Sequence, residues 1–218
     1  MSRTKLQRFQ IISERRNVIE PQKALFHKVR GNWGNLFFRN QHDIIVEVGC
    51  GKGEYTIGMA NLFPNKNFIG IDIKGSRIWK GSTVAEENGL QNVAFLRNFV
   101  ENLNENFAAG EVSELWITFP DPRPRLGEAK KRLTSERFLN LYESLVKKGG
   151  IIHFKTDCQD LFDFTLELLK KRKASNLKFT YDLYTSELQH HTLNIQTTYE
   201  KRFLAEGVTI KYLQYTNT

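Results

Sequence analysis

Three glycines and one aspartate in the first third of the chain have the types and spacing of a nucleoside-binding site. Gly49, Gly51 and Gly53 follow an apolar, strand-like run at every second position. Glycine lets the backbone adopt positive φ and lets a ligand lie against the main chain. Asp72 ends a second apolar run at 67–71. A carboxylate at that position can accept hydrogen bonds from both hydroxyls of a ribose.

The spacing of the glycines favours S-adenosylmethionine over a dinucleotide. The dinucleotide fingerprint is Gly-x-Gly-x-x-Gly, with a helix N-terminus facing a pyrophosphate. Here the third glycine comes one residue early, and the acidic Glu47 precedes the first glycine. A carboxylate at this strand end repels a diphosphate and attracts a cation. S-adenosylmethionine carries a sulfonium and no phosphate, so we expect it as the ligand; the alternative is an ordinary tight turn of an α/β protein.

A second candidate site follows the fourth expected strand, where residues 119–125 read Phe-Pro-Asp-Pro-Arg-Pro-Arg. The prolines stiffen the backbone and present Asp121 on a rigid loop. A basic run at 129–133 comes next and is suited to backbone phosphates. The alternatives are a local Pro-rich turn and a solvated basic face.

Strands and helices alternate through the middle of the chain, which predicts a mostly parallel sheet with helices on both faces. The glycine turn then lies at the carboxyl edge of the sheet, where ligands bind. No helix is expected between the last two strands, so these should form an antiparallel edge. The expected strands are seven, at 43–48, 67–72, 92–97, 114–119, 151–155, 179–184 and 207–215, and the expected helices begin at 54 and span 76–88, 134–147 and 160–173.

The charge of the chain indicates a polyanionic partner. The 218 residues carry a formal net charge of +8, and residues 1–40 alone hold nine Lys or Arg against two acids. A basic segment beside a catalytic domain attracts nucleic acid, with steep salt dependence. We expect residues 1–19 to form a basic, partly disordered arm and residues 20–218 to form a single domain.

Several classes of protein are disfavoured by composition. No stretch is apolar for the length of a membrane span, and the N-terminus lacks the apolar segment of a signal peptide. The two cysteines, Cys50 and Cys158, indicate free thiols in a reducing compartment, so a cytoplasmic location is expected. His190 and His191 have no partner ligands at metal-binding spacing, so no metal is expected. A monomer and a homodimer both stay open.

Six motifs occur in an order that resembles the bacterial tRNA (guanine-N7-)-methyltransferases. They are Glu-Val-Gly-Cys-Gly-Lys-Gly from position 47, Gly-Ile-Asp-Ile-Lys from 70, Phe-Pro-Asp-Pro from 119, Lys-Lys-Arg-Leu-Thr from 130, Lys-Thr-Asp from 155 and Thr-Thr-Tyr-Glu-Lys-Arg-Phe from 197. The resemblance covers about residues 20–215. It implies a Rossmann-like class I S-adenosylmethionine-dependent methyltransferase fold. It also implies methylation of N7 of the variable-loop guanine at position 46 of tRNA.

The resemblance implies roles for individual residues, with Asp121 as the catalytic residue. The cofactor-binding residues would be Glu47, Gly49, Gly51, Gly53, Asp72, Asn98 and Asp121, the substrate-binding residues Arg125, Asp157, Thr197, Thr198, Tyr199 and Glu200, and the RNA contacts Gly127, Glu128, Ala129, Lys130, Lys131 and Arg132. Some positions depart from the family pattern: Asn98 stands where the family usually has Asp, and Tyr199 where it has Phe. Arg123 and Arg125 occupy the usual aromatic and lysine positions.

Three other functions are compatible with parts of the sequence. An S-adenosylmethionine enzyme acting on an adenine N6 or a protein amide would favour an Asn/Asp-Pro-Pro-aromatic loop, which differs from the segment at 119–123. A non-catalytic RNA-binding protein would not need Glu47, Asp72 and Asp121 together. A nicotinamide-dependent dehydrogenase is the third alternative.

Overall fold

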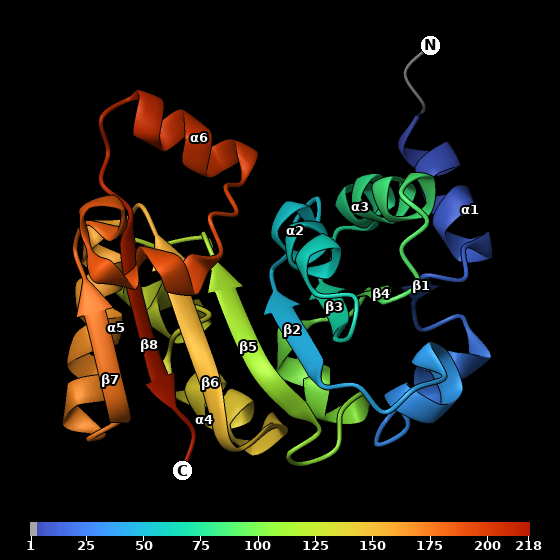
Figure 1. The fold of residues 1–218 in the computed structure, drawn as a ribbon, viewed down its shortest axis with the longest axis horizontal. Coiled ribbons are helices and arrows are strands. Elements are labelled where there is room, and N and C mark those ends of the chain that lie inside the picture. Colours follow the sequence, from blue (N-terminus) through green and yellow to red (C-terminus); the bar gives the residue numbers. More distant parts are fainter. Residues whose placement is uncertain (1–3) are drawn as a thin grey trace.

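One sheet of eight strands runs through the computed structural model, which describes residues 4–218 (Figure 1). The strands lie in the order β1-β4-β3-β2-β5-β6-β8-β7. Their bounds are β1 Val18–Ile19, β2 Ile44–Val48, β3 Asn67–Ile71, β4 Val93–Leu96, β5 Val112–Thr118, β6 Val146–Thr156, β7 Ser175–Thr180 and β8 Lys211–Thr216.

The direction of the strands brings the candidate residues to one edge. The strands from β1 to β6 pair in parallel, whereas β8 pairs antiparallel with both β6 and β7. Every residue of the central strand β2 is buried, as expected for a parallel strand covered on both faces. The carboxyl ends of β2, β3, β5 and β6 lead directly into the glycine turn, Asp72, Phe119 and Asp157, which therefore share one edge of the sheet. In Figure 1 the labelled strands β2, β5 and β6 point to the upper edge.

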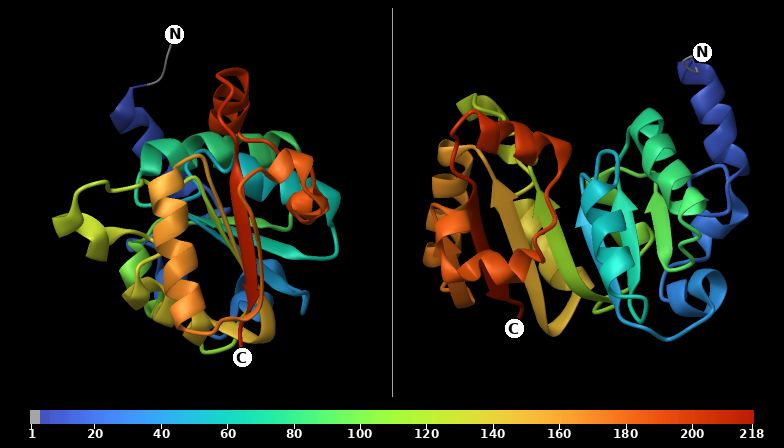
Figure 2. Two further views of the ribbon diagram at one scale, coloured as in Figure 1. Left: turned by 90° about the vertical axis from the view of Figure 1, so that its left-hand side faces the viewer. Right: turned by 45° about the horizontal axis from the view of Figure 1, so that its top comes forward.

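Helices cover both faces of the sheet, and the sheet divides the core into two layers (Figure 2). One layer packs Ile45 and Phe68 of the sheet against α1, α2 and α3. The other packs Val46 and Leu115 against α4 and α5. The α-helices are α1 Lys5–Glu14, α2 Glu54–Leu62, α3 Gly75–Glu87, α4 Glu136–Leu145, α5 Gln159–Lys171 and α6 Thr198–Ala205.

The end of the chain differs in two ways from the sequence prediction. The prediction of no helix between the last two strands is wrong, because α6 lies between β7 and β8. The antiparallel edge is nevertheless confirmed by the pairing of β7 with β8. Strand β7 also begins earlier than the predicted 179–184, and Leu183–Thr185 instead form a 3₁₀ turn capped by the side chain of Asp182.

The beginning of the chain also differs from the prediction. Residues 1–3 of the predicted arm lie outside the described residues, but residues 4–19 are folded. Strand β1 adds an eighth strand to the predicted seven by pairing with β4. Helix α1 packs closely on α3: a Cβ at Gly75 would lie 2.6 Å from Phe9 Cε1 and 2.9 Å from Ile12 Cδ1. Residues 4–19 are therefore ordered parts of the domain and not a disordered arm.

The end of α1 is fixed by a lysine that the sequence did not single out. The ammonium of Lys23 donates to the carbonyl oxygens of Ile12, Arg15 and Val18 at 2.9, 2.6 and 2.7 Å. One side chain thus joins the C-terminal end of α1, at Ile12 and the C-cap Arg15, to the first residue of β1. Within the described residues, no helix combines the length and apolar character needed to span a membrane.

Candidate active site

A cavity of about 270 Å³ lies at the carboxyl edge of the sheet, beside the glycine turn. Residues far apart in the sequence form its walls, and both candidate motifs contribute. It is lined by Glu47, Gly49, Cys50, Gly51, Lys52, Glu54, Arg77, Thr118, Phe119, Thr197, Thr198, Tyr199 and Arg202. The fold thus brings the glycine turn and the segment 197–199 to opposite sides of one cavity.

The glycine turn has the backbone that its sequence predicts. Gly49, Gly51 and Gly53 have φ of 71°, 57° and 72°, a region that other residues rarely adopt. A Cβ at Gly53 would lie 2.5 Å from Phe95 Cε1, so this position also needs glycine for packing. A Cβ at Gly51 would meet no atom of residues 4–218 within 4 Å. The open space beside Gly51 gives a ligand access to the main chain.

Glu47 lies at the base of the cavity and is almost fully buried, with 2% of its surface exposed. Its carboxylate accepts hydrogen bonds from Thr56 N at 2.9 Å, from the Thr56 hydroxyl and from Thr118 Oγ1 at 2.5 Å. Burial raises the pKa of Glu47 from 4.5 to about 7, against the opposing effect of these donors. A cationic ligand in the cavity would favour the charged carboxylate, which fits the sulfonium predicted from the sequence.

The raised pKa of Glu47 predicts that the ligand-free protein loses stability as the pH rises. The folded pKa of about 7 lies above the unfolded value of 4.5, so the stabilisation is complete below pH 4.5 and is lost as the pH rises through 7. The loss corresponds to about 3 kcal/mol between pH 4.5 and pH 8. We expect Glu47→Gln to remove this component, measured by urea unfolding at both pH values. An equal stability difference between the two proteins at both pH values would contradict the prediction.

Two other predicted cofactor residues lie outside the lining of the cavity. Asp72 is buried and accepts from Gly51 N at 3.0 Å and from Lys74 N at 2.7 Å, so its carboxylate fixes the glycine turn. Asn98 is buried and donates to Asn106 Oδ1 at 2.7 Å. The structure thus brings Asp72 to the turn but does not place Asn98 in the cavity wall.

The loop that carries Asp121 bends sharply at two points. Phe119 and Arg123 both have φ of 47°, in the left-handed region. This conformation is costly for a bulky aromatic residue, and such strain concentrates at functional sites. Phe119 forms part of the cavity wall, whereas the side chain of Asp121 is 66% exposed and pairs with Arg123 Nε at 3.2 Å. Asp121 therefore lies two residues beyond the wall, on the solvent side.

The predicted RNA-contact residues form a protruding 3₁₀ helix, η4 (Leu126–Lys131). In the left view of Figure 2 this yellow-green segment stands out from the body of the molecule. Gly127, Lys130 and Lys131 are exposed there, as is Arg125 before it, while Glu128 and Ala129 are half-buried. Arg132 differs from the others, since it is buried, donates to the Arg123 carbonyl at 3.3 and 3.2 Å, and stacks over Phe164. Arg132 therefore stabilises the loop that carries Asp121 and Arg123.

The segment 183–205, which we call the cap, closes the other side of the cavity. Thr197 caps α6 through its hydroxyl, which accepts from Glu200 N at 3.2 Å. Thr198 reaches across the mouth of the cavity, where its N and Oγ1 donate to Glu54 at 2.7 and 2.5 Å. Tyr199, also in the cavity wall, is 54% exposed. Helix α6 stands above the carboxyl ends of β5 and β6 in Figure 1.

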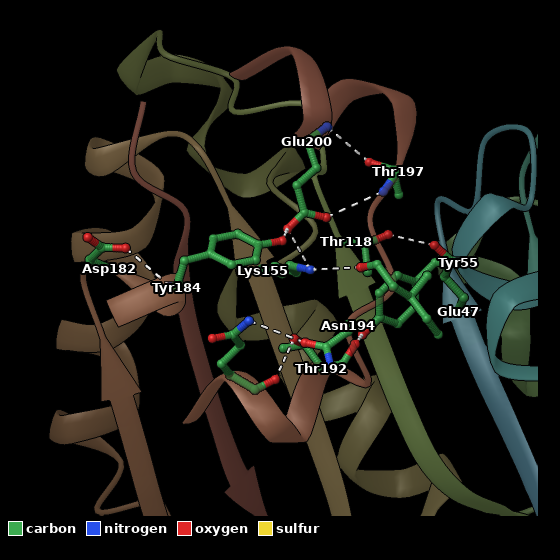
Figure 3. A network of polar contacts seen from close by, with 12 residues as sticks. Glu47, Tyr55, Thr118, Lys155, Asp182, Tyr184, Thr192, Asn194, Thr197 and Glu200 are labelled. Atoms are coloured by element: carbon green, nitrogen blue, oxygen red, sulfur yellow. Dashed lines mark hydrogen bonds and ion pairs between the residues drawn. The ribbon is translucent and has the colours of Figure 1, made fainter. Parts of the chain in front are cut away.

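A buried ion pair ties the cap to the sheet (Figure 3). Lys155 Nζ lies 2.7 Å from Glu200 Oε1, and both side chains are 0% exposed. Glu200 also accepts from Tyr184 OH at 2.7 Å and from Thr197 N at 3.4 Å. Burial lowers the pKa of Lys155, and the charge of Glu200 opposes that change. Glu200, predicted from the resemblance to bind substrate, here has its carboxylate enclosed by protein groups.

The last predicted substrate residue, Asp157, lies at the end of β6 and is half-buried. Burial raises the pKa of its carboxyl group. It is absent from the cavity lining, as is Arg125. In the part of the chain that the structure describes, no group of three or more His, Cys, Asp or Glu is arranged to hold a metal ion.

Several residues of the cavity wall were not predicted from the sequence. Lys52, Glu54 and Arg77 bring charge to it, and Thr118 brings a hydroxyl. Lys52 and Glu54 stand within or beside the glycine motif, so proximity alone could have suggested them. Arg77 and Thr118 come from α3 and β5, and only the fold brings them to the cavity.

Solved structures show the same fold in other methyltransferases. The 16S rRNA methyltransferase KamB aligns with a TM-score of 0.62 over 83% of this chain and 91% of that chain, at 18% identity. A structure titled as an antibiotic-related methyltransferase aligns with a TM-score of 0.58 over 99% of this chain and 94% of that one, also at 18% identity. The predicted Rossmann-like class I methyltransferase fold is thus confirmed.

Sequence comparisons identify closer relatives. A family model described as a putative methyltransferase matches residues 41–213. The tRNA (guanine-N(7)-)-methyltransferase of Cytophaga hutchinsonii is 50% identical over 99% of this chain and 98% of its own length. The protein of the same name from Bacteroides thetaiotaomicron is 43% identical over 99% of this chain and 86% of its own length. With matches of this extent, the chain belongs to the tRNA (guanine-N(7)-)-methyltransferase family.

Proposed function

We propose that this protein transfers a methyl group from S-adenosylmethionine to N7 of the variable-loop guanine at position 46 of tRNA. The observation that carries the proposal is that the glycine turn and residues 197–199 line opposite sides of the same cavity. The names of its relatives support the substrate class. The proposal includes a cytoplasmic location, where tRNA is modified.

The chemistry of guanine N7 determines what the residues must do. N7 is an unprotonated lone pair on the major-groove edge, so its attack needs no general base. When bound, S-adenosylmethionine supplies an activated methyl group on a sulfonium. The protein's contribution is to hold the reacting atoms in line. Gly49 and Gly51 would hold the cofactor against their backbone, with Glu47 supplying negative charge at the base of the cavity.

We propose that the carboxylate of Asp121 binds the target guanine and stabilises its developing charge. Positive charge develops on the ring during transfer, and a fixed carboxylate nearby stabilises it. The same carboxylate can accept hydrogen bonds from guanine N1 and N2. Since Asp121 is paired with Arg123, the guanine must displace that pair as it enters. Exposed ion pairs contribute only about 0–1 kcal/mol, so this displacement costs little.

The test is a methyl-transfer assay on unmodified tRNA, with borohydride and aniline cleavage to map the modified base. We expect cleavage at the single variable-loop guanine and no labelling of a transcript in which that guanine is replaced by adenine. Ribosomal RNA serves as a competing substrate, because several structures with this fold are of 16S rRNA methyltransferases. Label on an adenine, or on ribosomal RNA alone, would exclude the proposed function.

A further inference from the structure

A second cavity adjoins the first, between α1, the glycine turn and the start of α3. Its volume is about 300 Å³, and it is lined by Arg8, Lys52, Ser76, Arg77, Trp79 and Lys80. Four of these residues are cations, and none is acidic. Lys52 and Arg77 also line the first cavity, so the two spaces share a wall. We call this second cavity the basic groove.

The cations of the basic groove are not engaged in ion pairs with the described residues. Within residues 4–218, none of its four cations has an ion-pair partner within 4.0 Å. Neighbouring arginines do have such partners, for example Arg15 with Glu86 at 3.3 Å. Like charges held together without counter-charges repel one another and attract an anion. The groove is therefore electrostatically prepared for an anionic ligand.

Packing contacts hold Arg8, the α1 residue of the basic groove, in place. The guanidinium of Arg8 lies over the Trp79 ring, 4.8 Å from its centroid, and this contact fixes its plane. The Nε atom of Arg8 is buried and has no hydrogen-bond partner among the described residues. A buried donor without a partner is costly, so an anionic acceptor beside this guanidinium would be favourable. Helix α1 holds Arg8 in place through its close contact with Gly75.

We propose that the basic groove binds backbone phosphates of the RNA strand next to the methylated nucleotide. This inference rests on the proposed function, because it assumes that the target base enters the adjoining cavity. A polynucleotide with one base there must carry its neighbouring phosphates across the surrounding surface, and the groove adjoins that cavity and offers four cations outside any ion pair of the described residues. The groove also explains the function of the basic N-terminal segment: as a folded helix, it supplies one wall.

The test uses residues that line the groove but not the first cavity. These are Arg8 and Lys80, changed together to glutamine in the full-length chain. The control pair is Lys148→Gln with Lys171→Gln, exposed lysines near the start of β6 and at the end of α5, on the opposite edge of the sheet. Both pairs remove two positive charges, so an effect of net charge alone would appear equally in both.

The quantity to be measured is the affinity of each variant for tRNA over a series of salt concentrations. The Arg8→Gln/Lys80→Gln protein should bind at least tenfold more weakly at 0.1 M salt. The slope of log K against log salt should fall by about 1.4 to 1.8, the value for two lost phosphate contacts. The control pair should keep the wild-type slope. Affinity for S-adenosylmethionine should change less than twofold in all variants, because neither pair lines the first cavity.

The outcomes separate this inference from the proposed function. Wild-type slope and affinity in the groove variant, with normal methylation by the wild type, would overturn the groove and leave the function standing. Failure of the wild type to methylate tRNA would overturn the function itself. Arg8 packs on Trp79, so its loss could unfold the protein. Lys80→Glu, a change at an exposed position, provides a second variant with the same expected weakening and an unchanged melting temperature.

Discussion

Replacement of Asp121 by alanine is expected to reduce the rate of methyl transfer by about 10²–10³-fold, the usual cost of removing one charge-stabilising group. Affinity for S-adenosylmethionine should change little, because Asp121 does not line the cavity beside the glycine turn. Single-turnover methylation of tRNA measures the rate, and calorimetry measures the cofactor affinity. Stability should also be unaffected, since the side chain is 66% exposed.

The control for this experiment is Glu136→Ala, which removes another exposed carboxylate, at the start of α4. It should leave the methylation rate at the wild-type value. Unchanged turnover in Asp121→Ala would refute the role of Asp121. An equal loss of rate and of cofactor affinity would show that Asp121 acts on the cofactor rather than on the guanine.

Disruption of the Lys155–Glu200 pair is expected to have the largest effect on stability. Glu200→Gln leaves the ammonium of Lys155 without a counter-charge at a site with 0% exposure. Breaking a buried pair in this way costs about 3–5 kcal/mol of unfolding free energy. Because Glu200 also holds Tyr184 and Thr197, the cap should loosen and the KM for tRNA should rise. Urea unfolding and steady-state kinetics measure the two effects.

A double-mutant cycle tests whether this loss comes from the pair itself. Lys155→Met and Glu200→Gln are made separately and together. Removal of both charges leaves no uncompensated ion, so the double variant should be clearly more stable than the sum of the single losses predicts. Additive losses would mean that the two side chains stabilise the protein independently and that the cap is held by its other contacts.

The sequence predicted those parts of the fold that depend on local chemistry. The glycine turn was predictable because each of its glycines adopts a backbone angle that other residues avoid. The buried strand before it was predictable because it begins with three consecutive β-branched apolar residues, Ile44, Ile45 and Val46. Helix α6 was missed because its residues were interpreted as a binding motif, although Thr197 and Glu200 also form a capping box. Strand β1 was missed because two residues give no periodicity.

The arrangement of the site depends on contacts that a single sequence does not contain. Nothing in the local sequence pairs Lys155 with Glu200, since they come together only when the cap folds over β6. Arg132 looked like one of several phosphate-binding cations, but its stacking on Phe164 of α5 makes it part of the loop support. Helix α1 looked like a tail because its charge is conspicuous, whereas its apolar contacts, Phe9 and Ile12, are few.

The contact between the cap and α2 constrains how this enzyme can diverge or be redesigned. A Cβ at Gly58 would lie 2.8 Å from Ile195 Cγ2, and Tyr55 OH donates to the Thr192 carbonyl at 3.0 Å. The helix that follows the glycine turn is thus shaped to fit the cap. A cap transplanted from a distant homologue would therefore need a matching α2, so the two elements must be exchanged together.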